Sequence, residues 1–237
     1  MKTKGGKTVY GASVGVLMLE TQFPRIPGDM GNATTWPFPM HYTVVKGASP
    51  DLVVRHKAEG LLDNFIASAK ELVERGADGI TTTCGFLALF QDQLTAAVNV
   101  PIATSSLMQV PMVNALLPPG KRTGILTISE SALTEDHLKA SGAPLDTPIG
   151  GTEAHGSEFT RAILDDEPEM DLVQARIDMM EAGRDLVTRH PEVGAIVFEC
   201  ANMAPYAAEL QRETGRPIFS IYTLVQWFQA GLQPRSF

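Results

Sequence analysis

The stretch Gly79-Ile-Thr-Thr-Thr-Cys-Gly-Phe-Leu-Ala-Leu-Phe90 places a cysteine, Cys84, between a short β-branched run and an apolar segment. The chain has two cysteines, and the second, Cys200, lies in Ala195-Ile-Val-Phe-Glu-Cys-Ala-Asn-Met-Ala-Pro-Tyr206, which has the same order of features. Because β-branched runs favour strands, each stretch predicts a strand that ends at a cysteine, followed by a helix.

A shift of 116 residues carries Cys84 onto Cys200 and relates the two stretches. The same shift carries Ile80, Leu94, Pro101, Ile102 and Pro118 onto Ile196, Leu210, Pro217, Ile218 and Pro234. Any two strand–helix–strand units share buried isoleucine, valine and proline, so some matches are expected without a repeat. Because both cysteines match, we interpret the chain as a duplication of one α/β half.

Strands and helices alternate along both halves. We expect strands at 14–19, 41–45, 80–83, 101–103, 123–128, 195–199 and 217–220, and helices at 57–75, 87–98, 107–117, 171–189, 203–213 and 222–232. This alternation predicts parallel strands and an α/β fold. Residues 20–39 contain four prolines and two glycines, and a loop of this length is typical of a lid or a binding loop.

The two cysteines fall where α/β sheets bind ligands, outside the carboxyl ends of the strands. We expect each following helix to lower the pKa of the thiol and to offer backbone N–H groups, from Gly85 and Phe86 at one corner and from Ala201 and Asn202 at the other. If the thiols face each other, one removes a proton from a substrate carbon and the other returns one to the opposite face, without a cofactor. The alternatives are that the cysteines are buried packing residues or form a disulfide, which a reducing compartment disfavours.

Composition excludes several classes of protein. The formal net charge of −8 disfavours binding to nucleic acid or to an anionic membrane surface. No apolar run reaches the roughly 18 residues of a membrane span, and the amino-terminal region lacks a clean secretory signal, so we expect a cytoplasmic protein. The five histidines are scattered, and no short Cys/His spacing predicts a metal site.

The duplicated α/β halves, with a cysteine at each equivalent strand end, resemble the cofactor-independent aspartate/glutamate/hydantoin racemase superfamily. The resemblance implies two pseudo-symmetric parallel-sheet domains, formed by residues 1–117 with 222–237 and by residues 118–221. It also implies an active site in the cleft between them, Cys84 and Cys200 as the acid/base pair, a small-molecule substrate and a homodimer.

The residues after each cysteine indicate which branch of the superfamily the chain resembles. Gly85-Phe86 and Ala201-Asn202 stand where glutamate and aspartate racemases have Asn-Thr and Thr-His. The segment 200–204 is similar to the Cys-Ala-Gly-Met pattern of hydantoin and allantoin racemases. The Pro-Gly-Asp loop and the segment 126–129 resemble arylmalonate decarboxylase, a relative that keeps only the second cysteine.

These residues together predict an isomerase, namely a racemase or epimerase. We expect it to act at a carbon beside a carboxylate or a cyclic amide. Retention of Cys84 favours racemisation over decarboxylation. An enzyme like arylmalonate decarboxylase or maleate isomerase, and a ligand-binding protein without activity, stay as alternatives.

Further residues are candidates for substrate contact. Thr83 is placed to touch a substrate, although threonine is also a common strand residue. The resemblance puts a hydroxyl of Thr127 or Ser129 on the substrate carboxylate, whereas Ser129 also suits a helix N-cap. Asn202 could hold substrate or cap its own helix. Glu199 could raise the proton affinity of Cys200, unless strand alternation points its side chain away.

Overall fold

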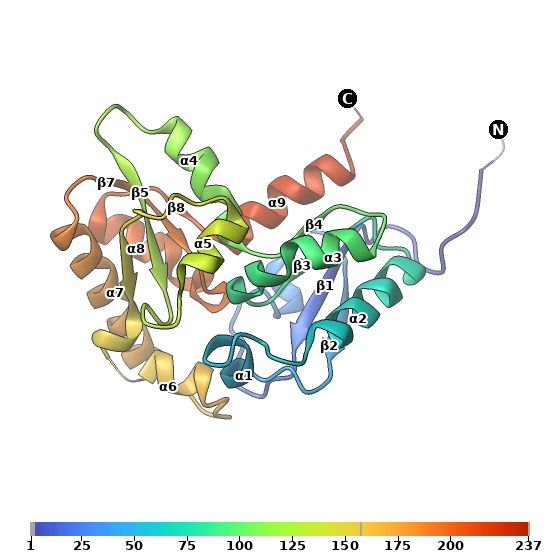
Figure 1. The fold of residues 1–237 in the computed structure, drawn as a ribbon, viewed down its shortest axis with the longest axis horizontal. Helices are drawn as coiled ribbons and strands as arrows, with labels where there is room; N and C mark the ends of the chain where they lie inside the picture. The colour runs from blue at the N-terminus through green and yellow to red at the C-terminus, as the bar shows by residue number, and fades with distance from the viewer. Residues whose placement is uncertain (1–2, 157, 237) are drawn as a thin grey trace.

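The computed structural model describes residues 3–156 and 158–236 and contains two parallel four-stranded sheets that lie side by side (Figure 1). The first sheet has the order β2-β1-β3-β4, with β1 at Val14–Leu19, β2 at Met40–Val45, β3 at Gly79–Thr82 and β4 at Ile102–Ala103. The second has the order β6-β5-β7-β8, with β5 at Arg122–Thr127, β6 at Ile149–Gly151, β7 at Val193–Phe198 and β8 at Ile218–Phe219. The predicted α/β fold with two parallel sheets is confirmed.

The two sheets repeat one another in register as well as in order. Ile80 of β3 pairs with Ile102 of β4, and Ile196 of β7 pairs with Ile218 of β8. These four residues are related by the same shift of 116 that relates the cysteines. The carboxyl ends of β3 and β7 therefore occupy equivalent places in the two halves.

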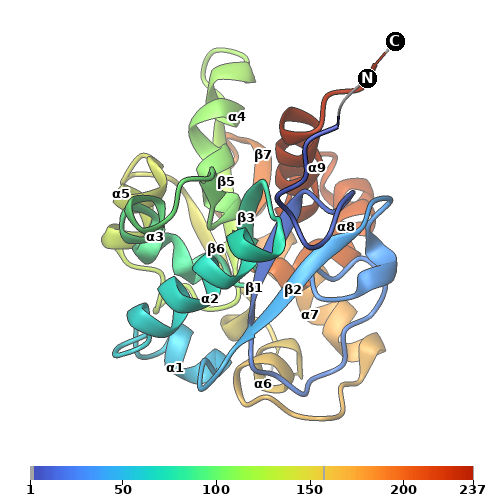
Figure 2. The ribbon, with the colours of Figure 1, turned by 90° about the vertical axis from the view of Figure 1, so that its right-hand side faces the viewer.

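Helices flank both sheets (Figures 1 and 2; Figure 2 views the molecule from the side of edge strand β2). The α-helices are α1 Pro50–Val54, α2 Leu62–Arg75, α3 Gln91–Ala97, α4 Val110–Leu116, α5 Glu135–Ser141, α6 Glu158–Leu164, α7 Leu172–Arg189, α8 Ala207–Thr214 and α9 Ile221–Leu232. Short 3-10 helices occur at η1 Ala33–Thr35, η2 Gly85–Phe90, η3 Ser106–Gln109, η4 Thr152–Ala154 and η5 Ala201–Tyr206.

Local chemistry explains where the helices differ from expectation. Helix α2 begins at Leu62 rather than at 57, because Lys57 and Ala58 adopt left-handed backbone angles (φ 52° and 54°) that interrupt a helix. It ends at Gly76 (φ 116°), as its sequence predicts. Pro111 stands in the first turn of α4, where a proline is tolerated.

Helix α9 packs against the first half of the molecule. Its residues Ile221, Leu224 and Val225 share a buried cluster with Val14 and Val16 of β1. This contact supports our proposal that residues 222–237 belong with 1–117, a division that stays a prediction. Among the residues described, no helix is both long enough and apolar enough to cross a membrane.

Candidate active site

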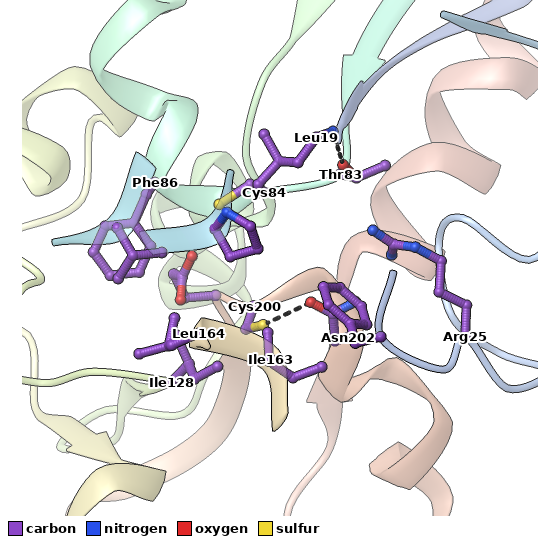
Figure 3. A pocket seen from close by; sticks show the side chains of 14 residues that line it. Leu19, Arg25, Thr83, Cys84, Phe86, Ile128, Ile163, Leu164, Cys200 and Asn202 are labelled. Atoms are coloured by element: carbon purple, nitrogen blue, oxygen red, sulfur yellow. Dashed lines mark hydrogen bonds between the residues drawn. The ribbon is translucent and has the colours of Figure 1, made fainter. Parts of the chain in front are cut away.

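The two cysteines line one cavity at the carboxyl ends of β3 and β7 (Figure 3). Each is the extended residue before a 3-10 helix, with φ −146° for Cys84 before η2 and −74° for Cys200 before η5. Cys84 is partly exposed and Cys200 is 7% exposed, and both are free thiols. A disulfide between them is therefore absent.

The cavity has a polar end and an apolar end. Figure 3 shows Arg25 and Asn202 on one side of the sulfur atoms and Phe86, Ile128 and Leu164 on the other. The remaining lining residues are Leu19, Phe23, Pro50, Val54, Thr83, Ile163 and Glu199. The cavity volume is about 20 Å³, which accommodates a single water molecule.

A buried carboxylate, Glu199, lies beside the cysteines. Its side chain is enclosed by protein, since the residue is 1% exposed. Atom Oε2 accepts a hydrogen bond of 2.7 Å from the Thr127 hydroxyl, whereas Oε1 has no hydrogen-bond partner among the described residues. Burial raises the pKa of Glu199 to about 7, although the Thr127 hydroxyl and the amides of Ile128 and Phe86 act to lower it. Strand alternation thus does not point this side chain away from the site.

Both thiols bind their protons more tightly than a free cysteine does. Burial raises the pKa of Cys84 and of Cys200, and the negative charge of Glu199 raises both further. The expectation that these pKa values are lowered is therefore wrong, although the backbone amides that follow each cysteine do act to lower them. The helices that follow the cysteines are short and of the 3-10 type, and desolvation outweighs their amide donors.

A chain of hydrogen bonds connects Cys200 to the loop at 20–39. The Cys200 thiol donates to Oδ1 of Asn202 at 3.4 Å, and Nδ2 of Asn202 donates to Oδ2 of Asp29 at 2.6 Å. Oδ1 of Asp29 accepts from Nη1 of Arg25 at 2.8 Å. Because a carboxylate only accepts hydrogen bonds, Asp29 fixes the amide orientation that presents Oδ1 to the thiol.

Loop 20–39 forms part of the cavity wall and is attached to the second half of the chain. Asp166 accepts hydrogen bonds from the backbone N–H groups of Gln22 (2.8 Å) and Phe23 (3.3 Å). The guanidinium of Arg25 lies 4.5 Å from the centre of the Phe23 ring. The loop is thus bound to the second half of the chain and contributes Phe23 and Arg25 to the cavity wall.

The structure brings most of the predicted site residues to the cavity. Cys84, Cys200, Thr83, Phe86 and Asn202 line it, and the Thr83 hydroxyl also accepts from the Leu19 backbone at 3.1 Å. Gly85 and Ala201 are buried directly after the cysteines.

Four predicted site residues, Gly85, Ala201, Thr127 and Ser129, are not among the lining residues, and the last two have other hydrogen-bond partners. The Thr127 hydroxyl binds Glu199, and the Ser129 hydroxyl donates to Glu153 at 2.6 Å. Their role in substrate binding stays a prediction.

Arg25 is one of three residues of loop 20–39 that belong to the site and were not predicted from the sequence. It is the single basic residue of segment 20–39, and that isolated charge in a proline-rich loop was a usable signal. Asp29 and Phe23 come from the same loop and were also not predicted as site residues. Within residues 3–156 and 158–236, no group of three or more His, Cys, Asp or Glu side chains is arranged to hold a metal ion.

Solved structures with a similar fold include a decarboxylase and several racemases. Arylmalonate decarboxylase superposes with a TM-score of 0.56 at 15% identity, covering 94% of this chain and 93% of that one. The aspartate racemase of Picrophilus torridus (TM-score 0.57, 13% identity, 93% and 95% covered) and the allantoin racemase of Pseudomonas fluorescens (0.54, 14%, 92% and 90%) are also similar. The chain has the fold of the aspartate/glutamate/hydantoin racemase superfamily, as its cysteine corners predict.

Proteins that are similar to this chain in sequence are named for a different activity. A dimethylsulfoniopropionate lyase of Durusdinium sp. clade D is 25% identical over 229 residues, covering 93% of this chain and 75% of that protein. Dimethylsulfoniopropionate lyase 3 of Emiliania huxleyi (strain CCMP1516) is 27% identical over 232 residues, covering 93% of this chain and 60% of that protein. No model of a known protein family matches the chain.

These relatives correct the functional prediction. They are named dimethylsulfoniopropionate lyases, and not racemases, epimerases or other isomerases. The expectation of a racemase or epimerase, and with it the isomerase class, is therefore wrong. The decarboxylase and cis–trans isomerase alternatives likewise do not agree with the names of the relatives in sequence. The two strand ends that carry a cysteine correctly indicated the fold, but enzymes with one fold can catalyse several different reactions.

Proposed function

We propose that the protein is a lyase that splits a β-sulfonio carboxylate of the dimethylsulfoniopropionate type into acrylate and dimethyl sulfide. The observation that carries the proposal is the similarity to dimethylsulfoniopropionate lyases over 93% of the chain, together with a cavity built around two cysteines. In this reaction a base removes the proton beside the carboxylate. The C–H electron pair becomes the C=C bond, and the C–S pair leaves with neutral dimethyl sulfide.

The two ends of the cavity suit the two ends of such a substrate. Arg25, at the polar end, offers a guanidinium to the carboxylate, and it also keeps its bond to Asp29. Phe86, Ile128 and Leu164, at the other end, suit the two methyl groups on sulfur, and the Phe86 ring favours a cation. The carbon that loses its proton then lies between the ends, beside the thiols.

The surroundings of the thiols favour Cys84 as the base. The positive charge of Arg25 and the amides of Phe86 and Leu87 act to lower the pKa of Cys84, against the larger effect of burial. Cys200 donates to Oδ1 of Asn202 and faces the negative charge of Asp29, and both favour its protonated form. We therefore assign Cys84 to proton removal, while Cys200 stays a neutral thiol that donates to Asn202.

A substrate of this size requires the cavity to open, because the closed volume accommodates one water molecule. Loop 20–39 contributes Phe23 and Arg25 to the wall, so its displacement admits the substrate, and its return excludes water during the reaction. The homodimeric state and the cytoplasmic location stay predictions from the sequence.

The test is to incubate the purified protein with dimethylsulfoniopropionate and measure dimethyl sulfide by headspace gas chromatography and acrylate by liquid chromatography. We expect equal amounts of both products, and a fall in turnover of roughly 100- to 10,000-fold for Cys84→Ser. Thermal unfolding of the variant provides the control for folding. A folded protein that releases neither product, or a Cys84→Ser variant with full turnover, would overturn the proposal.

A further inference from the structure

The proposed reaction leaves the buried carboxylate of Glu199 without a role, although it is the only carboxylate among the described residues that line the cavity. Its Oε1 atom has no hydrogen-bond partner in the described part of the chain. An unpaired buried oxygen costs free energy, since the atom gives up its hydrogen bonds to water. Such an atom in a reaction cavity therefore requires an explanation.

Oε1 lies directly against the backbone that follows Cys84. A Cβ atom built on Gly85 would lie within 3 Å of both Oε1 and the carbonyl oxygen of Glu199, closer than real Cβ atoms approach other atoms. The carboxylate therefore reaches across from the second half of the chain to the Cys84–Gly85 peptide of the first. Burial is the larger cause of the raised pKa values of Cys84 and Cys200, and the negative charge of Glu199 raises both further.

A base at this position has a difficulty that Glu199 resolves. The Cys84 thiol holds its proton at neutral pH because its pKa is raised, yet only the thiolate can remove a proton from carbon. Bulk water is a poor acceptor for this proton, since the cavity has room for about one water molecule. A second base inside the cavity is needed.

We propose that Glu199 accepts the proton of the Cys84 thiol and so generates the thiolate that acts as the base. The S–H bond breaks with its electron pair left on sulfur, and an O–H bond forms at Oε1, so the pair keeps a single negative charge. The carboxylate becomes a neutral acid, which removes the repulsion that opposed the thiolate. After the thiolate takes the substrate proton, the carboxylic acid releases its own proton to solvent as the cavity opens.

The other titratable groups around the pair leave Glu199 as the acceptor. Cys200 is held as a thiol by Asn202, and Arg25 is bound to Asp29. His137 packs edge-on against Phe86 (ring centres 4.9 Å apart), where burial lowers its pKa to about 4 and keeps it neutral. The pKa of Glu199, about 7, leaves the carboxylate able to gain or lose a proton near neutral pH.

The test uses the rate at which iodoacetamide alkylates Cys84 between pH 5 and pH 10. Because the chain has two cysteines, Cys200→Ser leaves Cys84 as the sole thiol. We expect alkylation to rise with a midpoint near pH 7, as Glu199 loses its proton and the remaining proton is shared with sulfur. Adding Glu199→Gln should remove this rise and leave alkylation at alkaline pH alone, at least ~10-fold slower at pH 7.5.

Thr127→Val provides a second variant that keeps Glu199 in place. It removes the hydrogen bond to Oε2 that lowers the pKa of Glu199, so the midpoint should move to higher pH. Thermal unfolding confirms that each variant is folded. Equal profiles with and without Glu199, or a thiol that stays unreactive near pH 7 while Glu199 is present, would overturn the proposal.

This inference rests on the proposed lyase function for its place in turnover, but the alkylation assay needs no substrate. If Glu199→Gln removes the rise near pH 7 and no dimethyl sulfide is formed from the sulfonium substrate, the proposed function fails and the proton transfer holds. If dimethyl sulfide is formed and its pH profile is the same in the Glu199→Gln protein, the proton transfer fails and the lyase function holds.

Discussion

Gly85 and Glu199 are 114 positions apart in the sequence and touch in the structure, with the Glu199 carbonyl oxygen and Oε1 both lying where a Gly85 side chain would begin. The contact joins the two cysteine corners directly, because each residue is the neighbour of a cysteine. A glycine is required here by the close approach of another chain segment, and not by its own backbone angles, since Gly85 is absent from the glycines with positive φ.

Gly85→Ala should therefore disrupt the site. The added methyl group must displace Glu199, at a cost of about 1–3 kcal/mol in unfolding free energy and most of the turnover. Urea unfolding and dimethyl sulfide release measure the two effects. Gly231→Ala is the matched control, because that glycine lies in α9 with no atom within 4 Å of the new methyl group, and helix propensity favours the change. Normal turnover by Gly85→Ala would contradict the assigned contact.

Arg25→Gln should weaken substrate binding more than it slows the chemical step. If the guanidinium holds the substrate carboxylate, the lost charge-assisted hydrogen bond raises KM by roughly 10- to 100-fold, with a smaller fall in kcat. Steady-state kinetics of dimethyl sulfide release provide both constants. Arg55→Gln is the control, since Arg55 forms exposed ion pairs with Asp51 and Asp165 and does not line the cavity. An unchanged KM would show that the carboxylate binds elsewhere.

Asp29→Asn should reduce both stability and turnover. The Asp29 carboxylate, 2% exposed, accepts hydrogen bonds from Asn202, from Arg25 and from the backbone of Gly31 at 2.7 Å. Replacing one oxygen by an NH₂ group leaves a buried donor facing another, which costs about 1–3 kcal/mol.

The control for Asp29→Asn is Asp51→Asn. Asp51 pairs with Arg55 at the surface, where both side chains are close to half exposed, so its loss should cost under about 1 kcal/mol. Thermal and urea unfolding of the two variants test the difference. Equal losses of stability would mean that the hydrogen bonds of Asp29 contribute little.

Stability should depend on pH through Glu199. Its pKa in the folded protein, about 7, lies above the ordinary 4.5, so the folded state holds the proton more tightly than the unfolded state does. The resulting stabilisation is fully present below pH 4.5 and is lost as the pH rises through 7. Relative to Glu199→Gln, the wild-type protein should lose about 3 kcal/mol between these limits.

Urea unfolding of both proteins at several pH values provides the measurement. His137 acts in the opposite direction, because its pKa is lowered to about 4 and its stabilising effect is lost as the pH falls from 6.5 towards that value. It is present in both proteins, so the difference between them isolates Glu199. Parallel curves for the two proteins would mean that Glu199 titrates normally.

The sequence by itself determined the fold and the two cysteine corners. Short β-branched runs that end at Cys84 and Cys200 specify strands, and their spacing of 116 residues revealed a duplication that the paired registers of Ile80 and Ile196 confirm. Such patterns are local, so they can be recognised without knowing what packs beside them. The reaction cannot be recognised in this way, because enzymes with the same two cysteine-bearing strand ends catalyse different reactions.

Only the tertiary structure decided what surrounds the thiols. Glu199 follows β7, Arg25 and Asp29 come from loop 20–39, and Gly85 begins η2 in the other half, so their contacts depend on how these segments pack together. Their burial reversed the expected direction of the thiol pKa values, because desolvation depends on every segment that covers a group and not on its neighbours in the chain.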